Sequence, residues 1–89
     1  MPILKNVEAK IEQVERFKVD FLQNGVNVNG TKENIPQYEY SYAAPDDWTV
    51  AEWIMKRFHQ SYPGYDARVY DKNGLPVTNR NTKLSTIRK

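Results

Sequence analysis

Few residues in this chain are of a type that could perform catalysis or hold a metal. His59 is the only histidine, and there is no cysteine. The lack of cysteine excludes a disulfide scaffold, a thiolate metal site and a cysteine nucleophile. His59 lies one position past an apolar helical stripe, and the sequence places no nucleophile or carboxylate beside it. We therefore expect no catalytic residue, no cofactor, no metal site and no enzymatic activity.

The acidic residues also have simpler explanations than catalysis. Asp46 and Asp47 could form a metal or acid–base pair, but they lie just before a helix start, where carboxylates complement the helix dipole. Asp66 and Asp71 bracket a short predicted strand and are interpreted as turn residues. The four glycines are isolated, so no glycine-rich phosphate loop is present.

Three tyrosines form the most distinctive pattern. Tyr38, Tyr40 and Tyr42 alternate with polar residues, which predicts a strand with three aromatic rings on one face. That face could pack beneath a helix with its hydroxyl groups at the edge of the core. It could instead stack on nucleic-acid bases, as single-strand binders do. Both alternatives stay open at this point.

Basic charge gathers at the C-terminal end. Residues 1–71 hold eight Lys or Arg and eleven Asp or Glu, whereas residues 72–89 hold five Lys or Arg and no acid. Residues 78–89 are therefore a basic tail that could neutralise phosphates, or simply be a solvated terminus. The acidic balance of the rest argues against a nucleic-acid-binding body. The candidate partner-binding residues are Tyr38, Tyr40, Tyr42, Arg80, Lys83, Arg88 and Lys89.

The clearest local signal is a helix over residues 49–61. Thr49 and Glu52 have the spacing of a capping box, and Trp48 and Trp53 that of a hydrophobic staple. Pro63 and the glycine after it end the helix. Four apolar residues form its buried stripe: Val50, Trp53, Ile54 and Phe58.

The other elements are short. Residues 3–13 fit an amphipathic helix and a half-buried strand equally well, and residues 14–22 favour a strand through their β-branched and aromatic content. A turn is predicted at Asn24-Gly25, a strand at 67–70, a tight turn at 71–74 and an edge strand at 75–77 around Pro76. Leu84 and Ile87 offer two final apolar anchors. The predicted class is α+β: a small mixed sheet with one main helix on one face, ββαββ-like, plus an N-terminal helix or strand.

The order of elements resembles the ubiquitin-like β-grasp family. Residues 68–77 are similar to that family's third and fourth strands, and residues 82–87 to the Leu-Ser segment beyond them. The resemblance covers about residues 14–88 and implies a binding module with an exposed sheet. The family has a further central strand after the Leu-Ser segment, a slot that only residues 3–13 or 82–88 could fill here, and no Gly-Gly pair ends the chain. Conjugation in the manner of ubiquitin is therefore not implied.

Size and composition set the remaining expectations. The 89 residues fit one domain, 1–89, and 39% hydrophobic with 27% charged residues is an ordinary globular composition. No apolar run is long enough for a signal peptide or a membrane span, and a small domain without cysteine favours a reducing compartment. We expect a cytoplasmic protein.

The functional hypothesis follows from aromatic content. Tyr, Trp and Arg are the residues enriched at the energetic centres of protein interfaces, and this chain has six Tyr and two Trp. We expect a small protein–protein interaction module without catalytic activity. The alternative is a nucleic-acid-binding accessory protein that uses the basic tail and the tyrosine face.

Overall fold

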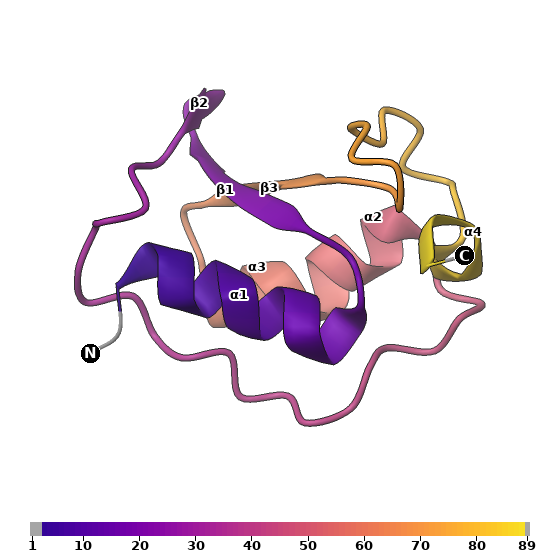
Figure 1. The fold of residues 1–89 in the computed structure, drawn as a ribbon, viewed down its shortest axis with the longest axis horizontal. Helices are drawn as coiled ribbons and strands as arrows, with labels where there is room; N and C mark the ends of the chain where they lie inside the picture. The colour runs from indigo at the N-terminus through magenta and orange to yellow at the C-terminus, as the bar shows by residue number, and fades with distance from the viewer. Residues whose placement is uncertain (1–2, 89) are drawn as a thin grey trace.

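A three-stranded antiparallel sheet lies on top of the helices in the computed structural model, which describes residues 3–88. Its strands are β1 (Val19–Gln23), β2 (Val26–Asn27) and β3 (Asp66–Val69), in the order β2-β1-β3. Helices cover only one face of the sheet (Figure 1). The predicted α+β class is confirmed, and both strand pairings within the described residues are antiparallel.

Alternate side chains of β1 point into the core. Val19 and Phe21 point inward and are buried, and they pair with the buried Val69 and Ala67 of β3. The predicted turn between β1 and β2 is confirmed: Asn24 and Gly25 have φ of 54° and 78°, the two positive values that a tight hairpin turn needs.

Residues near the N-terminus form the helix α1 (Leu4–Glu15), which resolves the alternative that the sequence left open. Leu4, Val7 and Ile11 are fully buried at helical spacing. The helix ends at Arg16, whose φ of 66° turns the chain toward the sheet. The predicted strand at 14–22 therefore begins later, at Val19, because the buried stripe of α1 continues to its last residue.

The predicted helix at 49–61 is confirmed, and it has one unpredicted feature. It consists of α2 (Val50–Trp53), a π-helical turn (Ile54–Phe58) and α3 (His59–Ser61). Its four stripe residues are at most 1% exposed. The capping box is also confirmed, because Thr49 Oγ1 accepts the Glu52 N–H and the Glu52 carboxylate accepts the Thr49 N–H.

A long connecting segment, residues 28–47, passes below the helices without forming a strand (Figure 1). The predicted strand at Tyr38–Tyr42 is therefore wrong. The main-chain groups of this segment bond to side chains instead of a neighbouring strand: Tyr42 O accepts from Arg57, and Ala44 N–H donates to Glu15. The segment is anchored by three buried residues, Ile35, Tyr38 and Ala44.

The C-terminal residues close the fold beside the start of α2. The predicted return of the chain at the sheet edge forms without a regular strand: Pro76 makes an isolated bridge to Tyr70, and the Val77 N–H donates to the Val69 main-chain oxygen. The chain then forms α4 (Leu84–Arg88), and the two predicted anchors, Leu84 and Ile87, are buried. In the described part of the chain, no helix has the length and apolarity needed to cross a membrane.

Candidate partner-binding surface

Five side chains at the π turn and the neighbouring connecting segment form what we call the aromatic surface. The Arg57 guanidinium lies over the rings of Tyr40 and Trp48, with its carbon 4.3 Å and 5.8 Å from the two ring centroids. The Lys56 ammonium lies 4.8 Å from the Trp48 ring centroid. These contacts are cation–π interactions, which are attractive at such distances. The aromatic surface comprises Tyr40, Tyr42, Trp48, Lys56 and Arg57.

The π turn and a buried carboxylate together hold Arg57 in place. Arg57 lies inside the π turn, a rare helical variant that occurs frequently at functional sites. Its guanidinium donates hydrogen bonds to the Glu15 carboxylate and to the main-chain oxygen of Tyr42. Its side chain is 14% exposed, so the charge lies just beneath the surface. Burial opposes its charged form, but the Glu15 carboxylate outweighs that effect and raises the pKa of Arg57.

Glu15 is the centre of a buried polar cluster, the Glu15 cluster, formed with Tyr38, Arg57 and Arg88. Glu15 is fully buried, accepts hydrogen bonds from the Tyr38 hydroxyl and the Ala44 N–H, and pairs with both arginines. A buried carboxylate is tolerated only when it is paired and hydrogen-bonded in this way. The cluster therefore joins α1, the connecting segment, the π turn and α4.

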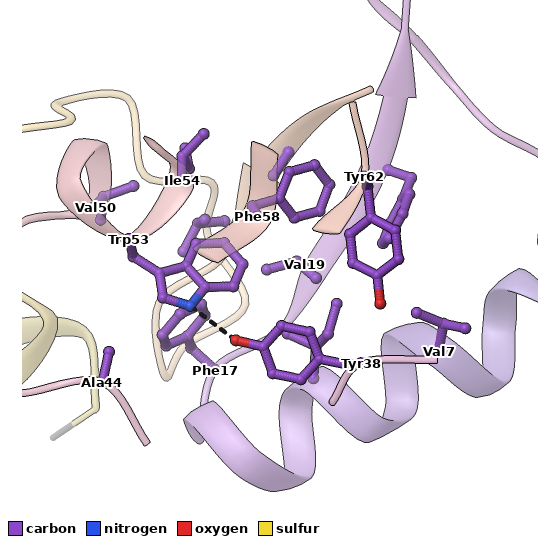
Figure 2. Close-up of a cluster of buried hydrophobic side chains, with 14 of the residues drawn as sticks. Val7, Phe17, Val19, Tyr38, Ala44, Val50, Trp53, Ile54, Phe58 and Tyr62 are labelled. Carbon is purple, nitrogen blue, oxygen red and sulfur yellow. Dashed lines mark hydrogen bonds between the residues drawn. The ribbon is translucent and has the colours of Figure 1, made fainter. Parts of the chain in front are cut away.

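The hydroxyl of Tyr38 connects the Glu15 cluster to the apolar core. It accepts a hydrogen bond from the indole N–H of Trp53 at 3.2 Å (Figure 2). Burial raises the pKa of Tyr38, as do its hydrogen bond to Glu15 and the charge of that carboxylate. The phenol thus stays protonated and serves as a hydrogen-bond donor to Glu15.

The structure separates the three candidate tyrosines. Tyr38 is 1% exposed, Tyr40 is half-buried between the Tyr38 ring and Arg57, and Tyr42 is 83% exposed. They therefore do not share one strand face. Tyr40 and Tyr42 belong to the aromatic surface, whereas Tyr38 lies in the core.

The basic candidates are also dispersed. Arg88 is only 9% exposed through its side chain, pairs with Glu15 and Asp46, and donates to the main-chain oxygens of Glu15 and Ala44. Arg80 pairs with Asp66 at 3.2 Å, and Lys83 donates to the Asp47 main-chain oxygen. Lys89, the last of the candidates, lies outside the described residues.

His59 and Asp46, considered from the sequence as possible catalytic or metal-binding residues, have side-chain partners in the structure. The His59 ring nitrogen lies 3.8 Å from an Asp66 carboxylate oxygen on the surface. Asp46 accepts from Arg88, and its main-chain oxygen accepts the Ser85 N–H. Between residues 3 and 88, no three His, Asp or Glu side chains are arranged to hold a metal ion.

Sequence reasoning missed Glu15, Trp48, Lys56 and Arg57 as members of a site. Glu15 carried a usable signal, because it continues the i,i+4 series of Val7 and Ile11 and so falls on the buried face of α1. A carboxylate on such a face requires a cationic partner. Arg57 carried no comparable signal, since its position depends on the π turn.

Comparisons with known proteins add no family assignment. No family model, no curated protein and no solved structure matches this chain. The resemblance to the ubiquitin-like β-grasp therefore stays a prediction.

Proposed function

We propose that this chain is a small, non-catalytic protein–protein interaction module that binds its partner through the aromatic surface. The single observation that carries the proposal is the stacking of Arg57 on the rings of Tyr40 and Trp48. The exposed Tyr42 adjoins this stack through its main-chain oxygen, which accepts a hydrogen bond from Arg57. We also propose a cytoplasmic location, supported by the absence of cysteine.

Energetic considerations support this choice of surface. Interface hot spots are enriched in Trp, Tyr and Arg, and these residues are most effective when they are already held in one conformation. Arg57 is held by Glu15 and by the Tyr42 carbonyl, so little side-chain entropy remains to be lost on binding. The other large exposed apolar side chains that the structure describes, Val26, Met55 and Leu75, are not members of the surface.

The nucleic-acid alternative has less support. Arg88 is committed to Glu15 and Asp46, which leaves Arg80 and Lys83 as the exposed candidates among the described basic residues. Two phosphate contacts would give a salt slope of only about −2 on duplex DNA. Reversing both charges to Glu and titrating DNA at several salt concentrations tests this alternative: a steep salt slope that the reversal removes would favour it.

The proposed function is tested by site-specific photo-cross-linking in the native host. A benzophenone amino acid replaces Tyr42 in one variant and Leu75 in another, because Leu75 is exposed to 60% in a turn outside the aromatic surface. We expect a discrete cross-linked protein from position 42 and none of the same mass from position 75. Failure of position 42 to cross-link any protein, with the variant folded and expressed, would contradict the proposal.

A further inference from the structure

We propose that residues 33–44 of the connecting segment, which we call the strap, open and close as one unit while the sheet and the helices stay folded. The Glu15 cluster holds the strap closed, and the buried hydroxyl of Tyr62 opposes closure. Native proteins open locally in cooperative units of this kind, at a lower free energy than global unfolding. Three observations carry the inference: how the strap is bonded, where main-chain bonding resumes, and which group faces it.

The strap is held by side chains and not by main-chain pairing. Within residues 3–88, no main-chain group of the strap bonds to another main-chain group. Its hydrogen bonds are made by the Tyr38 hydroxyl and by the main-chain groups of Tyr42 and Ala44. All but one of these bonds join the strap to the other members of the Glu15 cluster. Disruption of the cluster therefore releases nearly all polar contacts of the strap together.

Main-chain bonding resumes on both sides of the strap. Before it, the carbonyls of Gly30 and Lys32 accept hydrogen bonds from the first N–H groups of α1. After it, the Asp46 carbonyl accepts the Ser85 N–H of α4. The strap thus lies between two points at which the chain is fixed to helices, and these points limit the moving unit.

The hydroxyl of Tyr62 faces the strap without a partner. Tyr62 is 2% exposed, and its hydroxyl makes no hydrogen bond to any group of residues 3–88. It points toward the side of the core on which Tyr38 lies (Figure 2). Burial raises the pKa of Tyr62, and so does the charge of Glu39, a strap residue. A buried hydroxyl without a partner is unfavourable, so the closed strap loses stability that the open strap regains when water reaches this group.

Closure of the strap assembles the aromatic surface. Tyr40 and Tyr42 lie on the strap, whereas Trp48, Lys56 and Arg57 lie outside it. A partner that needs all five side chains binds only the closed form and shifts the population toward it. This consequence rests on the proposed function, whereas the opening of the strap does not.

Native-state hydrogen exchange of the full chain, followed by NMR, tests the strap. The Ala44 N–H reports on the strap, because it bonds to Glu15, and the Tyr70 N–H reports on the sheet, where it bonds to the Lys18 carbonyl. We expect Ala44 to be less protected than Tyr70. Its protection should fall with urea less steeply than that of Tyr70 but measurably, because the urea slope scales with the surface exposed on opening.

Two tyrosine-to-phenylalanine substitutions should shift Ala44 exchange in opposite directions. Tyr38→Phe removes the hydroxyl that donates to Glu15 and should speed the exchange about tenfold or more. Tyr62→Phe removes the unpartnered hydroxyl and should slow the exchange about fivefold or more. The two changes delete the same group, so only its role in the closed strap distinguishes them.

A substitution in the sheet provides the control. Val69 is buried in β3, and the helices lie between the sheet and the strap (Figure 1). Val69→Ala should speed the exchange of Tyr70 and leave that of Ala44 unchanged, because the strap opens without the sheet.

Four outcomes would overturn the inference in whole or in part. Equal acceleration of both amides by Val69→Ala would show that Ala44 exchanges only by global unfolding. A urea slope of zero at Ala44 would show that a single hydrogen bond breaks and not a unit. Unchanged Ala44 exchange in Tyr38→Phe would remove the role of the Glu15 cluster, and exchange no slower in Tyr62→Phe would remove that of the hydroxyl. These measurements use the chain without a partner, so they are distinguishable from a failed cross-link at position 42.

Discussion

The apolar core and the Glu15 cluster hold this molecule together by different means. In the core, Phe21 packs edge-on against Phe58 and Tyr62 with ring centroids 4.8 Å apart. Trp53 is fully buried in the same cluster (Figure 2). In the Glu15 cluster, one carboxylate is held by two arginines and a phenol. The core joins the sheet to the helices, whereas the Glu15 cluster joins the connecting segment to α1, the π turn and α4.

The comparison teaches how irregular segments become ordered. Apolar burial is non-directional and depends mainly on area, so many side-chain arrangements satisfy it. Charge-assisted hydrogen bonds are directional and leave a costly unpaired group when one partner is lost. The connecting segment has no sheet ladder, so charge-assisted hydrogen bonds to Tyr42 and Ala44 add to the burial of its apolar side chains. The predictions below compare the two regions, from the largest expected effect to the smallest.

Replacement of Trp53 by Ala should have the largest effect. The side chain is fully buried, and truncation of a large aromatic residue in a core costs about 3–5 kcal/mol. Small domains are stable by only about 5–15 kcal/mol, so the variant should be marginally folded. Urea denaturation followed by circular dichroism measures the effect. A midpoint within error of wild type would contradict a core anchored on this ring.

Replacement of Glu15 by Ala should lower the free energy of unfolding nearly as much, because it removes buried ion pairs rather than side-chain volume from the core. It leaves Arg57 without its carboxylate and Arg88 with Asp46 alone, and breaking a buried ion pair costs about 3–5 kcal/mol. Because both arginines are partly exposed and can regain water, we expect the low end, about 3 kcal/mol. The matched control is Glu12→Ala, an exposed position on the same helix, which should change stability by about 0.5 kcal/mol or less. Equal effects at the two positions would show that the Glu15 cluster contributes no more than a surface charge.

Loss of the Thr49 side chain should have a moderate and local effect. Thr49→Ala removes the oxygen that accepts the Glu52 N–H, and such caps contribute about 1 kcal/mol. Thr78→Ala, in an exposed loop, is the matched control and should be neutral. A destabilisation as large as that of Trp53→Ala would mean that the cap also supports the packing of the segment around Lys83, to which Thr49 is bridged.

The smallest predicted effect depends on pH. Burial raises the pKa of Glu8, the backbone N–H of Phe21 partly opposes this, and the charge of Asp20 adds to it. A carboxyl with a raised pKa in the folded state stabilises the fold below its unfolded pKa, and this contribution is lost as the pH rises through the folded pKa. The ionised Glu8 is thus slightly unfavourable at neutral pH.

Glu8→Gln should therefore stabilise the protein at pH 7 by up to about 0.5 kcal/mol, because an amide oxygen can still accept the Phe21 N–H. The gain should disappear below about pH 4, where glutamic acid is mostly protonated in any case. Denaturation midpoints of both proteins at the two pH values provide the measurement. Destabilisation at neutral pH would show that the hydrogen bond needs the full charge.

The elements that sequence predicted correctly are those with local causes. The helix beginning after Thr49 is specified by its own cap and stripe, and the turn at Asn24-Gly25 by residues that tolerate positive φ. Residues 3–13 supported two periods at once. In the folded chain they form a helix, because its buried face packs on the sheet and its first N–H groups donate hydrogen bonds to the carbonyls of Gly30 and Lys32.

Tertiary structure alone decided the candidate site. Tyr40 and Tyr42 were recognised from their alternation in the sequence, but their separation from Tyr38 depends on distant partners. Tyr38 bonds to Glu15, 23 residues away, and the main-chain oxygen of Tyr42 bonds to Arg57, 15 residues away. An alternating pattern predicts a strand only when another strand supplies the hydrogen bonds. Here side chains from α1, the π turn and α4 supply them, and such long-range polar contacts leave no periodic trace in the sequence.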